Sequence, residues 1–203
     1  MEENKHTKEK IREEALNLFA VYGYKAVSIR DICKKVGIKE SSLYYHYKNK
    51  QALFEAILEK VNEIMQEMEN QFTDVFSTIE SVEEEAFCQV AVGFLENYYL
   101  SSYIYKVIRV LSIERLSDDY AASMYQKWVF DLPLEKQTKV FEEMAEKKWI
   151  GHHKPNVLAY MYHAMIYLAF EKNCLGVECT EENIVQAKEE VKQCALDFFR
   201  SMR

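Results

Sequence analysis

SIRDICKKVGIKESSLYYHYKNK, residues 28–50, predicts two short helices joined by a tight turn. Ser28 is a favourable N-cap for the first helix, because its hydroxyl can accept from a backbone N–H of the first turn. The apolar residues after it recur at the spacing of one buried helical face: Ile29, Ile32, Cys33 and Val36. Gly37 then supplies a residue that can leave a helix with positive φ. This pattern is typical of a helix-turn-helix.

The second helix is expected to run from Lys39 to about Tyr47, anchored by Leu43. In a helix-turn-helix this helix offers its amino end to the major groove of DNA. Four polar residues lie at that end, where side chains reach base edges: Lys39, Glu40, Ser41 and Ser42. Donors suited to phosphate oxygens follow them: Tyr44, Tyr45, His46, Lys48 and Lys50. Base contacts and phosphate contacts are thus predicted at separate positions.

Ordinary packing in a small helical hairpin is the alternative explanation for the aromatic residues of the second helix. A small core seldom needs three tyrosines and a histidine in four consecutive residues, 44–47, followed by Lys-Asn-Lys. The composition of this segment therefore favours DNA binding over simple packing.

Three strings in the first 60 residues, YGY at 22–24, SIRDICKKVGI at 28–38 and LYYHYKNKQALF at 43–54, together resemble the DNA-binding domain of TetR-family transcriptional regulators. The resemblance implies base and phosphate contacts at Lys39, Glu40, Ser41, Ser42 and Tyr44, and phosphate contacts at Ser28, Tyr45, His46 and Lys50. Glu40 departs from what phosphate binding favours, because a carboxylate near DNA weakens affinity unless it accepts from a cytosine amino group. Beyond residue 60 the resemblance rests on the number of helices alone.

The composition predicts an all-α fold of about nine helices. Of 203 residues 49% are hydrophobic, which suffices for a sizeable core, and only 5 are Gly and 2 are Pro. We expect a three-helix DNA-binding domain at residues 1–50, followed at residues 51–203 by a helical domain that binds an effector and dimerises.

The net charge of −7 is unevenly distributed along the chain. Residues 1–50 carry 11 Lys and Arg against 7 Asp and Glu, a balance of +4, and the remainder carries 15 against 26, a balance of −11. A basic first segment attracts the phosphate backbone, whereas an acidic remainder disfavours indiscriminate adsorption to DNA.

Two helices flank the helix-turn-helix in the predicted order. The first spans about Thr7 to Tyr22 and is closed by Gly23, with these residues inward: Ile11, Ala15, Leu18 and Phe19. The next runs from Lys50 to about Phe72 and is too long to belong only to a DNA-binding domain. A ligand that displaces its far end would also move the recognition helix.

Capping and breaking residues mark the later helices. A capping box of Ser81 with Glu84 predicts one start, Ser117 predicts another, and Pro133 is expected to break or restart the helix that follows. The last two helices begin at Pro155 and at Thr180, which is followed by Asn183.

The last two helices are both amphipathic and are predicted to form a homodimer through a four-helix bundle. The alternative is that they complete a monomer core. One short recognition helix covers few base pairs, so a roughly palindromic operator read by a symmetric pair is expected.

Nine tyrosines between Tyr98 and Tyr167, with Trp128 and several methionines, suggest a pocket for a small hydrophobic or aromatic effector. A helical core with partly exposed tyrosines is the alternative. The predicted lining comes from helices that could converge beside the long helix: Met65, Met68, Tyr98, Tyr103, Val107, Met124, Trp128, Tyr162 and Met165. His163 and Arg109 are candidates for binding a carboxylate or hydroxyl, with a core histidine and a surface arginine as the simpler explanations.

Other classes of function find little support in the sequence. The cysteines and histidines lack zinc-ligand spacing, and no nucleophile with a base or phosphate-binding glycine loop is visible, so we expect no metal, no cofactor and no catalysis. No apolar leader or membrane span is evident, which favours the cytoplasm. The remaining alternatives are a DNA-binding architectural or recruiting factor without an effector, and a helical enzyme or binding protein whose N-terminal motif is vestigial.

Overall fold

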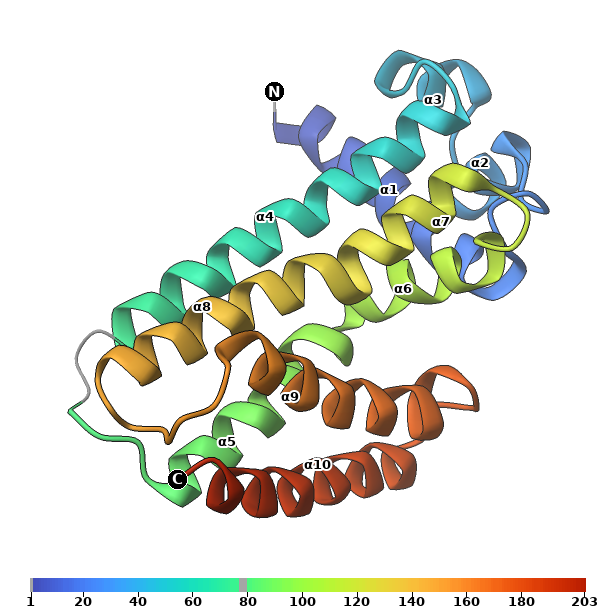
Figure 1. Ribbon diagram of the computed structural model, residues 1–203. Coiled ribbons are helices and arrows are strands. Elements are labelled where there is room, and N and C mark those ends of the chain that lie inside the picture. The colour runs from blue at the N-terminus through green and yellow to red at the C-terminus, as the bar shows by residue number, and fades with distance from the viewer. Residues whose placement is uncertain (1, 77–79) are drawn as a thin grey trace. The chain divides into compact units, whose positions relative to one another are not determined.

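A computed structural model describes residues 2–76 and 80–203, with side chains described for 4–68 and 80–203. The described residues form helices joined by loops and contain no strand, which confirms the all-α prediction (Figure 1). The helices are α1 (Glu2–Tyr22), α2 (Ile29–Val36), α3 (Glu40–His46), α4 (Lys50–Phe76), α5 (Glu84–Phe94), α6 (Ser102–Glu114), α7 (Asp119–Gln126), α8 (Leu132–Glu146), α9 (Pro155–Phe170) and α10 (Glu181–Ser201). Each described helix is too short or too polar to cross a lipid bilayer.

Three π-helical turns of five residues extend these helices: Leu95–Tyr99 after α5, Lys127–Asp131 between α7 and α8, and Glu171–Leu175 after α9. The second of them joins α7 to α8 without a break, so the described helical segments number nine. Pro133 closely follows this π-helical turn, in the first turn of α8, and the helix continues through it.

The contacts divide the chain into two compact units. Unit 1 comprises Met1–Ser77 and Ser102–Tyr125, and unit 2 comprises Thr78–Ser101 and Gln126–Arg203. This is a division by packing. The functional division at residue 50 expected from the sequence stays a prediction.

In unit 1, α1 packs against α2, α4 and α6. Its core positions include Ile11, Ala15 and Phe19, as predicted, but Leu16 is buried where Leu18 was expected to be fully inward. The wide buried face of α1 follows from its three helical neighbours. Gly23 ends the helix with φ of 83°, as its position in the sequence predicts.

Four predicted helix boundaries are confirmed. The Ser28 hydroxyl accepts from the N–H of Asp31, whose carboxylate in turn accepts from the N–H of Ser28, which completes a capping box. Gly37 ends α2 with φ of 82°. Pro155 opens α9, and the Thr180 hydroxyl accepts from a backbone N–H at the start of α10.

Two predicted boundaries are wrong. The expected box of Ser81 and Glu84 is absent, because α5 starts at Glu84 with Glu83 as its N-cap and the Ser81 hydroxyl donates to the Glu83 carboxylate. At α7 the cap is Asp118 rather than Ser117, because the Asp118 carboxylate accepts from the N–H of Ala121 at 2.9 Å. At α7 an acid thus replaces the expected serine as the cap, whereas the first turn of α5 has no side-chain cap.

In unit 2, α10 packs against α5 and α9, and α8 packs against α9. The hydroxyl of Tyr98 donates to the carbonyl of Trp128, and that of Tyr99 donates to the carbonyl of Val129 at 3.1 Å. Both acceptors belong to a π-helical turn, where the regular backbone ladder is altered. Two buried tyrosines therefore satisfy part of the backbone of an irregular helical turn.

Candidate DNA-binding site

The turn between α2 and α3 places the second helix against α1. The N–H groups of Gly37 and Ile38 both donate to the Cys33 carbonyl, at 2.9 and 3.0 Å, so the chain reverses within two residues. Leu43 is fully buried, and the Tyr47 hydroxyl donates to the Lys8 carbonyl of α1 at 3.1 Å. Leu43 and Tyr47 thus bury one face of this segment within unit 1, and the opposite face of α3 points outward.

The outward face of α3 carries most of the predicted DNA contacts. Its amino end is polar, with Lys39, Glu40 and Ser41 exposed and Ser42 partly exposed. Tyr44 and Tyr45 are both exposed as well. The side-chain amide of Asn4 donates to the Tyr45 hydroxyl at 3.3 Å, which leaves the hydroxyl proton free to point toward a phosphate. His46 is partly exposed and contacts the Tyr45 ring edge to face.

Ser28, a predicted phosphate contact, lies exposed at the start of α2. Its hydroxyl donates to the Asp31 carboxylate, and this hydrogen bond is the main cause that lowers the pKa of Asp31. If the Ser28 hydroxyl donates to a phosphate, it must therefore give up its hydrogen bond to the Asp31 carboxylate.

Lys50, another predicted phosphate contact, already has two partners inside unit 1. Its ammonium donates to the carbonyls of Tyr24 and Val27, both at 2.9 Å, and lies 4.3 Å from the centre of the Tyr24 ring. Partial burial lowers the pKa of Lys50, and the Glu114 carboxylate acts in the opposite direction. Lys50 thus holds the loop between α1 and α2, and its role at phosphate stays a prediction.

The nine residues predicted to line an effector pocket are divided between the two units. Unit 1 contains Met65, Met68, Tyr103, Val107 and Met124, and unit 2 contains Tyr98, Trp128, Tyr162 and Met165. Within unit 2 the structure brings Tyr98 to Trp128, whereas Tyr162 packs among Phe87, Phe141 and Phe198. In unit 1 the Tyr103 hydroxyl donates to the Ile57 carbonyl of α4. The common lining stays a prediction.

The two polar candidates in apolar surroundings differ in environment. Arg109 donates from Nε to the Ala20 carbonyl at 2.9 Å and from Nη1 to the Tyr105 hydroxyl, so it caps the end of α1. His163 is buried, with Nε2 3.2 Å from the Tyr99 hydroxyl. Among the described side chains, His163 Nδ1 and Trp128 Nε1 are buried polar atoms without a hydrogen-bond partner.

His163 should make the stability of the protein depend on pH. Burial lowers the pKa of His163 from 6.5 to about 4, so the folded state holds the neutral ring while the unfolded chain gains a proton below pH 6.5. Stability is therefore lost as pH falls from 6.5 toward 4, by up to about 3 kcal/mol. We expect His163→Gln to flatten this part of the curve when the free energy of unfolding in urea is measured across that range. His152→Gln, at an exposed histidine, is the control, and equal slopes for both variants would contradict the assignment.

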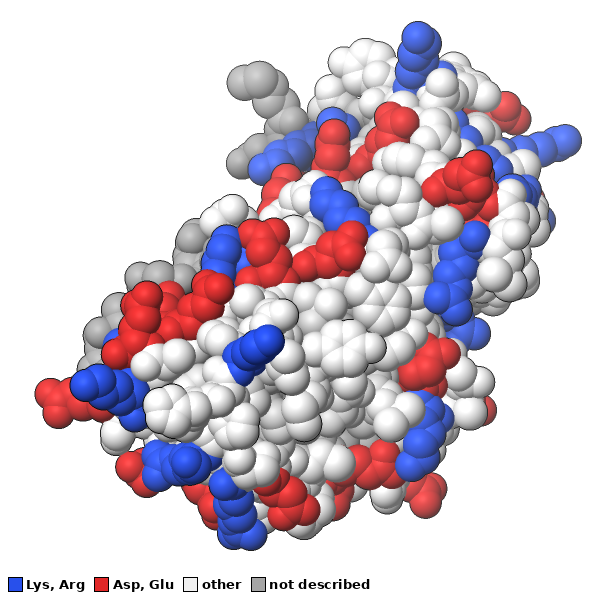
Figure 2. Space-filling view, viewed as in Figure 1, with Lys and Arg blue, Asp and Glu red and all other residues white. Residues whose placement is uncertain are grey.

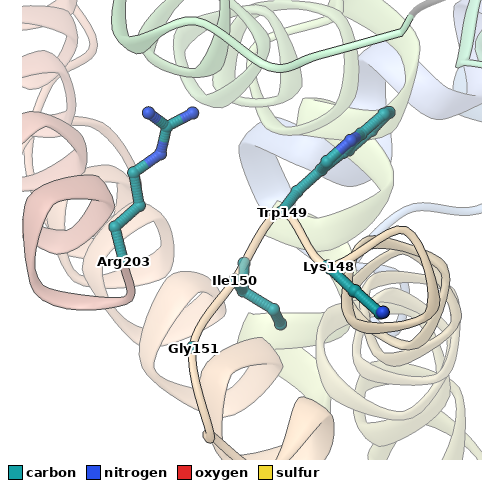
Figure 3. A pocket seen from close by; sticks show the side chains of 5 residues that line it. All are labelled: Lys148, Trp149, Ile150, Gly151 and Arg203. Atoms are coloured by element: carbon teal, nitrogen blue, oxygen red, sulfur yellow. The ribbon is translucent and has the colours of Figure 1, made fainter.

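A surface hollow of about 370 Å³ lies beside the loop between α8 and α9. It is lined by Lys148, Trp149, Ile150, Gly151 and Arg203. Trp149 and Arg203 come from separate segments and flank the opening, and Lys148 points to the other side of the loop (Figure 3). This hollow includes no residue of the predicted lining.

The outer surface of α9 is apolar. Its exposed apolar residues recur at the spacing of one helical face: Val157, Tyr160, Met161, Ala164 and Leu168. Figure 2 shows that the surface over α9 is largely without charge. Beside it, a hollow of about 390 Å³ is lined by residues of α9 and α10: Met161, Met165, Cys194, Asp197, Phe198 and Ser201. Contiguous exposed apolar patches are uncommon on monomeric soluble proteins and frequent at protein–protein interfaces.

Comparison with known proteins places the resemblance in the first part of the chain. Residues 11–57 match the family described as bacterial regulatory proteins, tetR family. The negative transcriptional regulator IcaR of the biofilm operon icaADBC from Staphylococcus epidermidis is 44% identical over 52 residues, which cover 26% of this chain and 28% of that protein. IcaR from Staphylococcus aureus strain Newman is 44% identical over 48 residues, 24% of this chain and 26% of that protein. The chain thus matches only about a quarter of the length of these relatives.

Solved structures share the fold over nearly the whole chain. A protein from Mesorhizobium loti assigned to the TetR family superposes with a TM-score of 0.77 at 16% identity, covering 98% of this chain and 97% of that one. SmeT in complex with triclosan superposes with a TM-score of 0.70 at 20% identity, covering 97% and 90%. At such identities the superpositions establish the all-α fold with an N-terminal helix-turn-helix, and nothing about ligands.

Proposed function

We propose that this chain, whose residues 11–57 belong to the tetR family of bacterial regulatory proteins, is a transcriptional repressor released from DNA by a small molecule. It binds a palindromic operator as a homodimer, and a hydrophobic or aromatic effector ends that binding. The observation that carries the proposal is the outward face of α3, where exposed Tyr44 and Tyr45 follow a polar amino end while Leu43 and Tyr47 are buried.

The DNA contacts that we propose are those implied by the resemblance. Residues at the amino end of α3 reach base edges, and Tyr44, Tyr45, His46, Ser28 and Lys50 contact phosphates or position the helix that does. The similarity to IcaR, a negative regulator, supports repression. The matching family and the structure from Mesorhizobium loti are described as regulators, which supports a function without catalysis.

The homodimer is proposed to form through α9 and α10. The apolar stripe runs along α9 from Val157 to Leu168, and α10 packs against α9. The α9 and α10 helices of a second copy can therefore complete a four-helix bundle. A symmetric pair also explains how so short a helix as α3 obtains specificity, because two half-sites are read together.

The effector is proposed to bind among the aromatic residues of the C-terminal helices. Four buried polar side-chain atoms in the described part of unit 2 have no hydrogen-bond partner: Trp128 Nε1, His163 Nδ1, and Nε2 and Oε1 of Gln137. Such atoms are costly unless water or a ligand satisfies them. The triclosan complex of SmeT supports an effector of aromatic character, by analogy of fold.

A DNA-binding factor without an effector is the second candidate. It is favoured by the position of the two hollows, since both open on the surface of unit 2 and only Met165 of the predicted lining contributes to either. Release from DNA by a small molecule separates the two candidate functions. A ligand shifts the balance between the DNA-bound and the released protein only if its affinities for the two forms differ.

The DNA-binding proposal predicts strongly salt-dependent affinity for the DNA upstream of the protein's own gene. Several phosphates are neutralised per dimer, so affinity should fall by on the order of 10³-fold between about 50 and 200 mM salt. Fluorescence anisotropy with that duplex, and with a shuffled duplex as control, measures both the slope and the specificity. Equal affinity for the two duplexes at every salt concentration would contradict specific binding. A panel of neutral aromatic and aliphatic compounds, added to the complex, then tests release.

A further inference from the structure

The loop between α1 and α2, residues 23–27, receives contacts from two other helices of unit 1. From α4, the Lys50 ammonium donates to the carbonyls of Tyr24 and Val27. From the end of α6, Glu114 Oε1 accepts from the backbone N–H of Lys25 at 3.2 Å. The loop leads directly into Ser28, the N-cap of α2, so whatever holds the loop also holds the start of the helix-turn-helix.

The side chain of Lys25 also contacts the end of α6 and the loop that follows it. Its ammonium donates to the carbonyl and the hydroxyl of Ser117, both at 2.9 Å, and lies 3.9 Å from Glu114 Oε2. Glu114 is only 5% exposed, and a buried carboxylate is tolerated when donors surround it. The donors found here come from the loop and not from α6 itself.

Two further contacts join α6 to the end of α1 and to the loop 23–27. Arg109 of α6 donates to the Ala20 carbonyl near the end of α1. Gly23 has φ of 83°, and a Cβ atom there would lie 3.0 Å from Glu114 Oε1, so a side chain at this position would displace the carboxylate. The last turns of α6 therefore contact the end of α1 and the loop together.

We propose that Glu114 and Lys25 form a latch, defined as the contacts of these two residues with each other and with Ser117, that positions α2 and α3 relative to α6. Displacement of the carboxyl end of α6 pulls on the loop through the latch and turns the recognition helix with it. Glu114 and Lys25 are positioning residues and need not contact DNA. The regulatory meaning rests on the proposed function, but the mechanical claim does not.

The test measures the distance between α3 and α6 with spin labels at Ser41→Cys and Ser102→Cys, both at exposed positions. The more accessible native cysteines are replaced by Cys179→Ser and Cys194→Ser, and labelled protein is diluted into excess unlabelled protein so that distances within one chain dominate. Lys25→Met, which removes the ammonium and keeps the apolar stem, is expected to broaden the distance distribution. Lys25→Arg is expected to restore a narrow one.

Lys139→Met is the matched control. Its side chain is 57% exposed and pairs with Glu135 at 2.8 Å, whereas that of Lys25 is 54% exposed, so both variants lose one surface cation with an acidic partner. The control should leave the distribution unchanged, and thermal melting should show that Lys25→Met remains folded. Glu114→Gln, which keeps one acceptor for the Lys25 N–H, should broaden the distribution as well.

An unchanged distribution in both Lys25→Met and Glu114→Gln would overturn the latch. That result is separable from failure of the proposed function, because the distances are measured without DNA. If the parent protein binds its operator but the distance distributions of the variants stay narrow, the latch proposal is wrong and the proposed function stands. If the distributions of the variants broaden but the parent protein binds no DNA, the latch proposal stands and the proposed function is wrong.

Discussion

Leu168→Glu is expected to convert the homodimer into a monomer and to weaken operator binding by on the order of 10²- to 10⁴-fold. Leu168 is 65% exposed at the carboxyl end of the apolar stripe on α9. In the proposed four-helix bundle this residue faces the partner, so a carboxylate there would lie in an apolar contact without a cation. Operator affinity falls with the dimer, because linked half-sites convert the second binding event into an intramolecular one. Sedimentation equilibrium at micromolar concentration and anisotropy on the operator measure the two effects.

Leu116→Glu provides the control for Leu168→Glu. Leu116 is 91% exposed in the loop between α6 and α7, so the same chemical change occurs on a surface that the proposed bundle does not use. This variant should remain dimeric and bind as the parent does. A Leu168→Glu protein that stays dimeric would place the interface elsewhere.

The second prediction separates the two kinds of DNA contact on α3. Ser42→Ala should change affinity at one position of each half-site, by about 1–3 kcal/mol for the base concerned, because the hydroxyl lies at the amino end of the helix. Tyr45→Phe removes only a hydroxyl from an exposed ring and should weaken binding to every duplex alike, by roughly fivefold. Affinities for a set of operators with single base changes distinguish the two patterns.

The interpretation of α3 depends on the contrast between these two variants. A uniform loss for Ser42→Ala, together with a base-specific effect for Tyr45→Phe, would reverse the assignment. Lys50→Ala, which we also expect to weaken binding uniformly, is a less clean test. Its ammonium holds the carbonyls of Tyr24 and Val27, so the substitution also loosens the loop before α2.

Local chemistry made the helix-turn-helix predictable from sequence. A capping serine, a glycine that adopts positive φ and an apolar spacing of three and four residues act within one or two turns, and the structure has each at the expected place. The starts of α9 and α10 at Pro155 and after Thr180 follow the same rules. Two acceptors compete at the start of α7, and the prediction from sequence took Ser117 where Asp118 is the cap.

Contacts over long separations in the chain were not predictable in this way. Glu114 is 89 residues from Lys25, and no spacing rule connects an acid near the end of one helix with a loop so far away. The π-helical turns were missed because a single inserted residue barely changes the apolar periodicity. The predicted effector lining was chosen by helix face, which does not determine how helices far apart in sequence meet.

In the proposed complex α3 reads DNA as one of a symmetric pair. Selection of duplexes from a random pool by the full chain, followed by sequencing, tests it most directly, since it assumes no operator and no effector. A symmetric pair should enrich two inverted copies of one short motif, with centres spaced by about one helical turn or a multiple of it. Failure to enrich any sequence, or enrichment of a single motif without an inverted copy, would rule out reading by a symmetric pair.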